Sequence, residues 1–314
     1  MHKEIHIAKA VLEDLYWNKN LKPRQIAQMF GIKNERTVRK KMEKYDIKRR
    51  TLSEAMTVKM KMPFTGDLAE KAYFLGLRTG DFHGKWVKKC IRLQTSTTHD
   101  AQLALLLSAF HKYATFCKYL YKKPNSKQDE WFIYVDLHPS FDFLVEKPTQ
   151  IPSWILNDDT FFFNFLAAYM DCEGNWHLTK SHEIHARFTF RLRTGDKEIL
   201  ENVKRKLESL GYITVFSLDI TKGTQGPSAP FRKDMYNLTL NGRGQASKLA
   251  KRLIPLSMHS EKVRKMRFML KHKDSKYLEL VSDWNKIKNQ IKKETLPLKE
   301  DWCEDQRNCS KQFY

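Results

Sequence analysis

Apolar positions recur at helical spacing near the start of the chain. Residues 4–20 place them on one side of an expected helix. A second helix is expected to begin at Pro23, and Gly31 to form the turn before a third helix capped by Asn34. The apolar core that these helices would share consists of Ile26, Ala27, Phe30, Ile32, Val38 and Met42. Residues 1–50 are therefore predicted to fold as a small all-α domain.

The third of these helices and the residues after it are strongly basic. Residues 33–50 hold nine basic and three acidic side chains, a net charge of +6. Two short helices joined at a glycine are typical of a helix-turn-helix, whose second helix enters the DNA major groove. The candidate DNA-binding side chains are Arg36, Arg39, Lys40, Lys44, Arg49 and Arg50. An ordinary solvated basic helix is the alternative. Residues 51–66 are expected to form a linker.

Beyond the linker the pattern of the chain occurs twice. The stretch "IRLQTSTTHDAQLALLLSAF" from Ile91 is echoed by "FRLRTGDKEILENVKRKLESLG" from Phe190, each a strand followed by a helix that starts with an acid. An apolar helix ending in an acid precedes each copy. We expect two copies of helix, two strands, helix, two strands, helix over residues 67–150 and 151–272. The fold class is thus α+β, each copy forming a four-stranded antiparallel sheet with helices on one face. Residues 273–314 are expected to add a helix and a tail.

Two of the predicted strands show which side of each sheet is open. Alternation places Arg187, Thr189, Arg191 and Arg193 on one face of the second copy, and Lys88, Arg92 and Gln94 on one face of the first. Arginine and glutamine are favoured partners of guanine and adenine in the major groove. No acid shares these faces in the two strands, which favours nucleic-acid contact over simple solvation.

The composition points to the same class of partner. The 314 residues carry 57 Lys+Arg against 36 Asp+Glu, a net charge of +21, which favours a polyanion. The longest apolar run is too short to span a membrane, and the first residues lack the apolar core of a signal peptide, so no membrane partner is expected. We expect a cytoplasmic or nucleoid-associated protein, or an organellar one in a eukaryote. The five cysteines show no zinc-ligand spacing.

The two acid-ended helices are the most informative feature. Gly76 and Gly80 in "FLGLRTGDF" correspond to Ala168 and Cys172 in "LAAYMDCEG", 92 positions later. Small residues four apart allow two helices to pack closely, and such packing would bring Asp81 and Glu173 together. Acids are unfavourable at the negative end of a helix dipole, and the pair would repel. Mg²⁺ is the expected positive charge that offsets both effects.

These two motifs resemble those of the LAGLIDADG homing endonucleases in their single-chain, two-motif form. The resemblance covers roughly residues 66–272 and implies two pseudo-symmetric αββαββα halves that form a DNA-binding saddle, with Asp81 and Glu173 as catalytic metal ligands. Phe82 stands where the family has glycine, and Thr79 where an acid is common. Asp171 is expected to have a structural role.

The resemblance implies metal-dependent double-strand cleavage of a long DNA target. Two or more Mg²⁺ ions, with Mn²⁺ able to substitute, would activate water and stabilise the leaving oxygen. Lys147 and Lys262 follow the last strand of each copy and are the candidate catalytic lysines, with solvated surface lysines as the alternative. The chain is expected to act as a monomer on double-stranded DNA. A DNA-binding regulator without catalysis and an intron-RNA maturase are the alternative functions.

Overall fold

The structure is a computed structural model that describes residues 7–18, 21–50, 61–121, 130–181, 185–226, 229–272 and 276–294. The chain divides into two compact units, residues 1–60 and 61–314, and each is described by itself. Most of the predicted linker and the predicted tail after residue 294 lie outside the described residues.

The N-terminal unit is all-α, as its spacing predicts. Its elements are α1 (Lys9–Glu13), the π-helical turn η1 (Asp14–Asn18), α2 (Pro23–Met29) and α3 (Glu35–Lys44). Gly31 takes a left-handed φ of +64° at the turn between α2 and α3. The Asn34 side chain caps α3 by accepting a hydrogen bond from the Arg36 amide at 2.9 Å. The predicted core is buried apart from Phe30, which is only partly buried.

The larger unit contains two four-stranded antiparallel sheets. The first has the order β1-β2-β4-β3 and the second the order β5-β6-β8-β7, so the same topology occurs twice. The strands are β1 (His83–Val87), β2 (Cys90–Thr97), β3 (Phe116–Tyr121), β4 (Glu130–Leu137), β5 (Gly174–Ser181), β6 (His185–Thr194), β7 (Val215–Ile220) and β8 (Met235–Asn241). The α+β fold class and the repeat predicted from the sequence are therefore confirmed.

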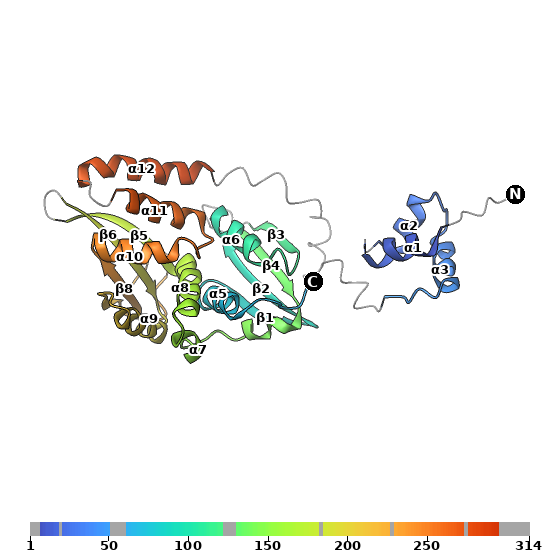
Figure 1. The fold of residues 1–314 in the computed structure, drawn as a ribbon, viewed down its shortest axis with the longest axis horizontal. Helices are drawn as coiled ribbons and strands as arrows, with labels where there is room; N and C mark the ends of the chain where they lie inside the picture. The colour runs from blue at the N-terminus through green and yellow to red at the C-terminus, as the bar shows by residue number, and fades with distance from the viewer. Residues whose placement is uncertain are drawn as a thin grey trace. The chain divides into compact units, whose positions relative to one another are not determined.

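Helices join the strands and separate the two sheets. In Figure 1, α5 and α8 lie at the centre of this unit, between the sheets. The helices are α5 (Leu68–Thr79), α6 (Asp100–Phe110), α7 (Ser153–Leu156), α8 (Asp159–Glu173), α9 (Lys197–Ser209), α10 (Arg243–Leu253), α11 (Ser260–Lys271) and α12 (Tyr277–Glu294). One hydrophobic core runs through both halves.

Within this repeat the two halves differ in the helix that closes each of them. The second half closes with α10, but the first closes with only a short 3₁₀ helix, η2 (Pro139–Leu144). Pro148 and Pro152 follow soon after η2, and because proline lacks an amide hydrogen they leave little chain for a longer helix.

The predicted C-terminal helix is present as α12 and packs against the second half. Leu280 and Trp284 are buried on the side of the helix that meets the core. Leu278 of the same helix, by contrast, is 74% exposed. Its position falls outside the i, i+4, i+7 series that Leu280 begins, so it lies on another face of the helix.

Candidate active site at the seam of the two halves

Small residues form the contact between α5 and α8, and this contact is the seam between the two halves. A Cβ atom placed on Gly76 would lie 2.8 Å from the Ala168 Cβ, and one on Gly80 would lie 2.4 Å from the Cys172 Cβ. Such distances are below van der Waals contact, so the helices approach as closely as their backbones allow. Each facing pair is 92 positions apart in the chain, which means that equivalent residues of the two halves meet. The predicted helix interface is present.

The same pairing brings Asp81 and Glu173 to one end of the seam. Burial raises the pKa of Glu173 to about 7, with a further increase from the nearby charge of Asp81. Burial also raises the pKa of Asp81, against the opposing effect of Lys262 and Lys147. The two helices end differently: Asp81 lies two residues beyond the end of α5, whereas Glu173 is the last residue of α8. The result is a pair of interacting carboxyl groups, of which Glu173 is half-buried and Asp81 more exposed.

Lys262 supplies the positive charge at the end of α8. Its Nζ donates hydrogen bonds to the backbone oxygens of Met170, Asp171 and Cys172 at 2.7, 2.5 and 3.1 Å. This ammonium group therefore offsets the negative end of the helix dipole. Burial lowers the pKa of Lys262. The three carbonyl contacts hold Lys262 beside both acids rather than on a solvated surface.

Lys147 also lies close enough to the acid pair to influence both carboxyl groups. Its Nζ forms an ion pair with Asp196 Oδ2 at 2.7 Å, and Lys233 contacts the other oxygen of Asp196 at 3.0 Å. The charge of Lys147 lowers the pKa of Asp81 and of Glu173, which places it within electrostatic reach of both. Both predicted lysines thus accompany the predicted acids.

Arg78 connects the chain next to Asp81 with the segment that carries Lys147. This buried side chain donates from Nε to Leu144 O at 2.8 Å, from Nη1 to Phe82 O at 2.9 Å and from Nη2 to Val145 O at 2.9 Å. Phe82, which departs from the family pattern, is buried in the core directly after Asp81. Arg78 therefore has a positioning role that the sequence reasoning did not identify.

Gln102 is a second residue that the sequence reasoning missed. It is 6% exposed in the first turn of α6, and its Nε2 lies 3.4 Å from Asp81 Oδ2. The sequence offered one signal for Gln102, which is its polar side chain within the mostly apolar stretch "DAQLALLLSAF". Gln102 can orient the Asp81 carboxylate through this contact.

Asp171 has the structural role expected for it. Its side chain is fully buried and accepts hydrogen bonds from Tyr73 Oη at 3.0 Å, Ser257 Oγ at 2.5 Å and the Met258 amide at 2.8 Å. The bond from Tyr73 crosses from the first half to the second. Thr79, the equivalent position in the first half, bonds instead within its own helix, to Leu75 O at 2.7 Å.

The donor set at the seam fits a magnesium ion. Asp81 and Glu173 supply carboxylate oxygens, and their mutual repulsion would be relieved by a cation. Within the described residues no group of three or more His, Cys, Asp or Glu side chains could hold a metal by itself. Mg²⁺ commonly binds through one or two carboxylates and completes its shell with water and substrate phosphates, so two acids suffice.

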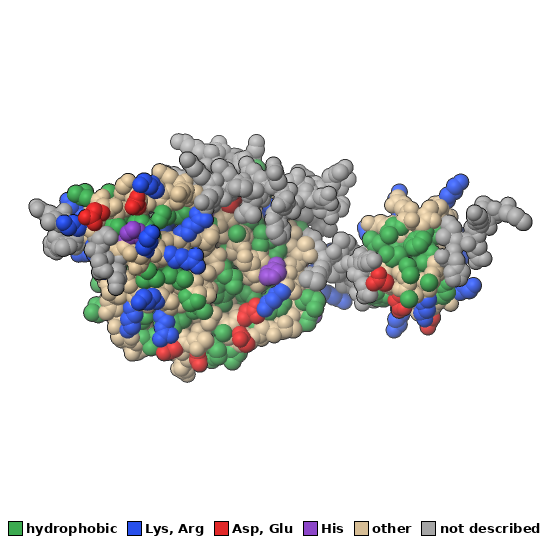
Figure 2. All heavy atoms as spheres, turned by 45° about the horizontal axis from the view of Figure 1, so that its top comes forward, with side chains coloured by type: hydrophobic (Ala, Val, Ile, Leu, Met, Phe, Trp, Pro, Cys, Tyr) green, Lys and Arg blue, Asp and Glu red, His purple; other side chains and the backbone are tan. Residues whose placement is uncertain are grey.

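The residues predicted to share the open face of the second half do share it, with one difference. Phe188, Phe190 and Leu192 are buried, so Arg187, Thr189, Arg191 and Arg193 point to the open side of the sheet. Arg193 forms an ion pair with Asp219 of β7 at 2.6 Å. Figure 2 shows Lys and Arg side chains gathered over the second half, at the left of the larger unit.

The open face predicted for the first half departs further from the sequence prediction. Lys88 lies in the turn between β1 and β2 with a φ of +55°, so it is not a strand residue as expected. Arg92 and Gln94 do face away from the core, opposite Asp136 and Tyr134 of β4. Arg92 binds Asp136 through two hydrogen bonds of 2.7 and 3.0 Å. The two strands considered in the sequence carry no acid on their open faces. In both sheets, however, a neighbouring strand contributes an acid that pairs with an arginine of this face: Asp136 in the first sheet and Asp219 in the second.

The basic side chains of the N-terminal unit fall into two groups. Arg36, Lys40 and Lys44 are exposed on α3, as is Arg39, which pairs with Glu35 at 2.8 Å. Arg49 is exposed and paired with Glu43. Arg50 has a structural role: it donates to Leu21 O at 2.7 Å and lies over the Tyr16 ring at 4.1 Å. Whether the exposed group contacts DNA stays a prediction.

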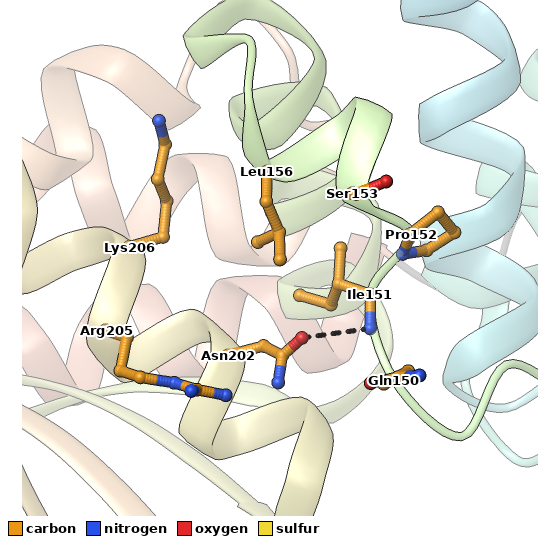
Figure 3. Close-up of a pocket in the computed structure, with 8 residues that line it drawn as sticks. All are labelled: Gln150, Ile151, Pro152, Ser153, Leu156, Asn202, Arg205 and Lys206. Atoms are coloured by element: carbon orange, nitrogen blue, oxygen red, sulfur yellow. Dashed lines mark hydrogen bonds between the residues drawn. The ribbon is translucent and has the colours of Figure 1, made fainter.

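A pocket of about 570 Å³ lies at the segment that joins the halves (Figure 3). Its wall includes Ile151 and Pro152 on one side and Asn202 and Lys206 of α9 on the other. The Asn202 side chain accepts a hydrogen bond from the Ile151 amide at 3.3 Å, which anchors the segment to α9. None of the predicted site residues lines this pocket.

No helix within the described ranges is both long enough and apolar enough to cross a membrane.

Comparison with known proteins finds likeness at the level of structure. No family model matches the chain, and no curated protein does. The homing endonuclease I-WcaI bound to its DNA recognition sequence is 18% identical, covers 64% of this chain and 88% of its own, and has a TM-score of 0.47. The LAGLIDADG meganuclease I-AabMI bound to uncleaved DNA is 12% identical over 71% of this chain and 96% of its own, with a TM-score of 0.41. A mutant of I-SmaMI is 11% identical over 74% and 96%, with a TM-score of 0.43. These structures come from the homing endonucleases, the family whose paired motifs the two seam helices resemble.

Proposed function

We propose that the chain is a site-specific DNA endonuclease that makes metal-dependent double-strand cuts. The observation that carries this proposal is the pair of carboxyl groups, Asp81 and Glu173, which the packing of α5 on α8 brings to one end of the seam. Each half supplies one acid, so one pair can serve two strands. A net charge of +21 suits a polyanionic substrate.

The residues around the acids have distinct tasks in this proposal. Bound Mg²⁺ would supply Lewis-acid activation of water and stabilise the leaving oxygen. Asp81 and Glu173 would hold it, while Gln102 orients the Asp81 carboxylate. Lys147 and Lys262 place positive charge beside the scissile phosphates, where negative charge develops. Lys262 acts from a fixed position, since three carbonyl oxygens hold its Nζ.

The open sheet faces and the N-terminal unit would bind the duplex. Arg187, Thr189 and Arg191 extend from β6 on the side away from the core, where a β-ribbon can enter a major groove. The helix-turn-helix would extend the contact through Arg36 and Lys40 of α3. Removal of residues 1–55 should then weaken DNA binding and leave metal-dependent cutting intact at high enzyme concentration.

The test is cleavage of a duplex selected from a random library by the full-length protein. Asp81→Asn and Glu173→Gln should each abolish Mg²⁺-dependent double-strand cutting while leaving the fold unchanged, as checked by circular dichroism. Glu198→Gln, at an exposed carboxylate of α9, is the matched control and should cut normally. Normal cutting by both acid variants would show that the site is misassigned. Specific binding without nicked product in the parent protein would identify a DNA-binding regulator instead.

A further inference from the structure

The open face of the first sheet carries a row of aromatic rings. Ile91 and Leu93 of β2 are buried, so Gln94 and Ser96 face away from the core, as do Tyr134 and Phe132 of β4, which pair with them. Tyr134 is only 8% exposed, so Phe132 is the more accessible of these two rings. Tyr119 of β3 stands directly opposite Phe132. The Tyr119 and Phe132 ring centroids are 5.1 Å apart, and those of Phe132 and Tyr134 are 6.3 Å apart. The three rings form one continuous patch.

The arginine beside this patch is committed to other partners. The Arg92 guanidinium forms two hydrogen bonds with Asp136 and lies 4.0 Å from the centroid of the Tyr134 ring. The Arg92 and Asp136 side chains are only 16% and 17% exposed. An arginine reads guanine through two parallel donors, and this arginine already uses two donors on a carboxylate. The first face therefore offers apolar surface where the sequence predicted a donor.

The matching face of the second sheet is polar apart from Val215 of β7, which pairs with Thr239 and is exposed. Its strands present Thr189 and Arg191 from β6 together with Asn237, Thr239 and Asn241 from β8, in register with one another. Thr189 Oγ1 donates to Asn241 Oδ1 at 2.9 Å. Among the described residues of these strands, no Phe, Tyr or Trp stands on this face. Two sheets of identical topology thus present different chemistry.

We propose that the two halves read their DNA half-sites differently: the first through apolar contact of Tyr119 and Phe132 with thymine methyl groups, the second through hydrogen bonds. This inference rests on the proposed function. The C5-methyl of thymine is the one apolar group that a base edge presents in the major groove. Aromatic rings on an open strand face are suited to it, since they gain from burying a methyl and make few demands on direction.

The same rings could instead stack on unpaired bases of a single strand. Stacking requires an open ring face. The Arg92 guanidinium covers one face of Tyr134, and the rings of Tyr119 and Phe132 pack on each other with an angle of 30° between their planes. These contacts occupy ring faces, and they favour contact with a methyl group on a duplex.

The experiment replaces thymine by deoxyuridine, which removes the methyl and keeps the base pair. The full-length protein first selects its duplex from a random library in Ca²⁺, and each half-site is then substituted separately. Affinity should fall about threefold to fourfold for each contacted methyl that is removed, in one half-site and not in the other. The double variant Tyr119→Ser/Phe132→Ser should lose this sensitivity.

Two further variants separate the outcomes. Tyr119→Leu/Phe132→Leu keeps the apolar surface without the rings, so it should retain sensitivity to deoxyuridine, and it provides a test should the serine variant fail to fold. Thr239→Ala, on the open face of the second sheet, is the matched control and should leave the sensitivity unchanged.

A selected duplex whose affinity is unchanged by deoxyuridine in both half-sites overturns this inference but not the proposed nuclease function. Tighter binding to the single strand than to the duplex, lost in the leucine variant, would assign the patch to base stacking and also overturn it. Failure to select any duplex would count against the proposed function itself.

Discussion

Replacing Glu173 by glutamine should stabilise the metal-free protein at alkaline pH. The carboxyl of Glu173 is partly buried beside Asp81, and its pKa is raised from 4.5 to about 7. Between these two values the folded protein holds a proton that the unfolded chain has released. The contribution of Glu173 to stability is therefore present below pH 4.5, falls as the pH rises, and is lost above pH 7. Glutamine stays neutral throughout.

The size of the effect follows from the shift in pKa. One pKa unit corresponds to about 1.4 kcal/mol, so the shift from 4.5 to about 7 corresponds to roughly 3 kcal/mol. At pH 5 the parent and Glu173→Gln should have similar free energies of unfolding. At pH 8 the variant should be more stable by an amount approaching that value. Part of this gain is the lost repulsion between the two acids, which already contributes to the raised pKa of Glu173.

The assay is urea unfolding of both proteins in EDTA across pH 5 to 8, followed by circular dichroism. Glu198→Gln, at an exposed carboxylate, should stay within about 0.5 kcal/mol of the parent at every pH. Added Mg²⁺ should stabilise the parent at pH 8 and not the variant, because only the parent keeps both acidic ligands. Parallel curves for the parent and Glu173→Gln across the whole pH range would refute the reasoning that the Glu173 carboxyl is partly buried beside Asp81.

Three further substitutions test the contacts that hold the seam. Lys262→Met should lower stability by about 2–4 kcal/mol, since three carbonyl oxygens lose a charged donor; a melting temperature equal to the parent's would disprove the contact. Gly80→Ala should cost about 1–3 kcal/mol in urea unfolding, because the new methyl meets the Cys172 Cβ at 2.4 Å, whereas alanine at the open Gly244 should be tolerated. Tyr73→Phe removes one donor from Asp171 and should cost about 1–3 kcal/mol; calorimetry that finds no loss would contradict a role for this bond.

The sequence predicts the seam better than its surroundings. Gly76 and Gly80 could be aligned with Ala168 and Cys172 from spacing alone, because helix packing depends on side-chain size at fixed intervals. The partners of Arg92 could not be predicted, since Asp136 lies 44 positions away and only strand register brings the two together. The three carbonyl bonds of Lys262 escaped prediction for the same reason: backbone acceptors carry no signature in a sequence.

The bond from Tyr73 to Asp171 means that the duplicated halves are no longer interchangeable. In an assembly of two second halves, the position equivalent to Tyr73 would be Phe165, which has no hydroxyl group. The fully buried carboxylate of Asp171 would then lose one of its three donors and keep those from Ser257 and Met258. Self-association of that half is penalised, and its pairing with the first half is favoured. One hydroxyl group thus distinguishes the two halves of the repeat.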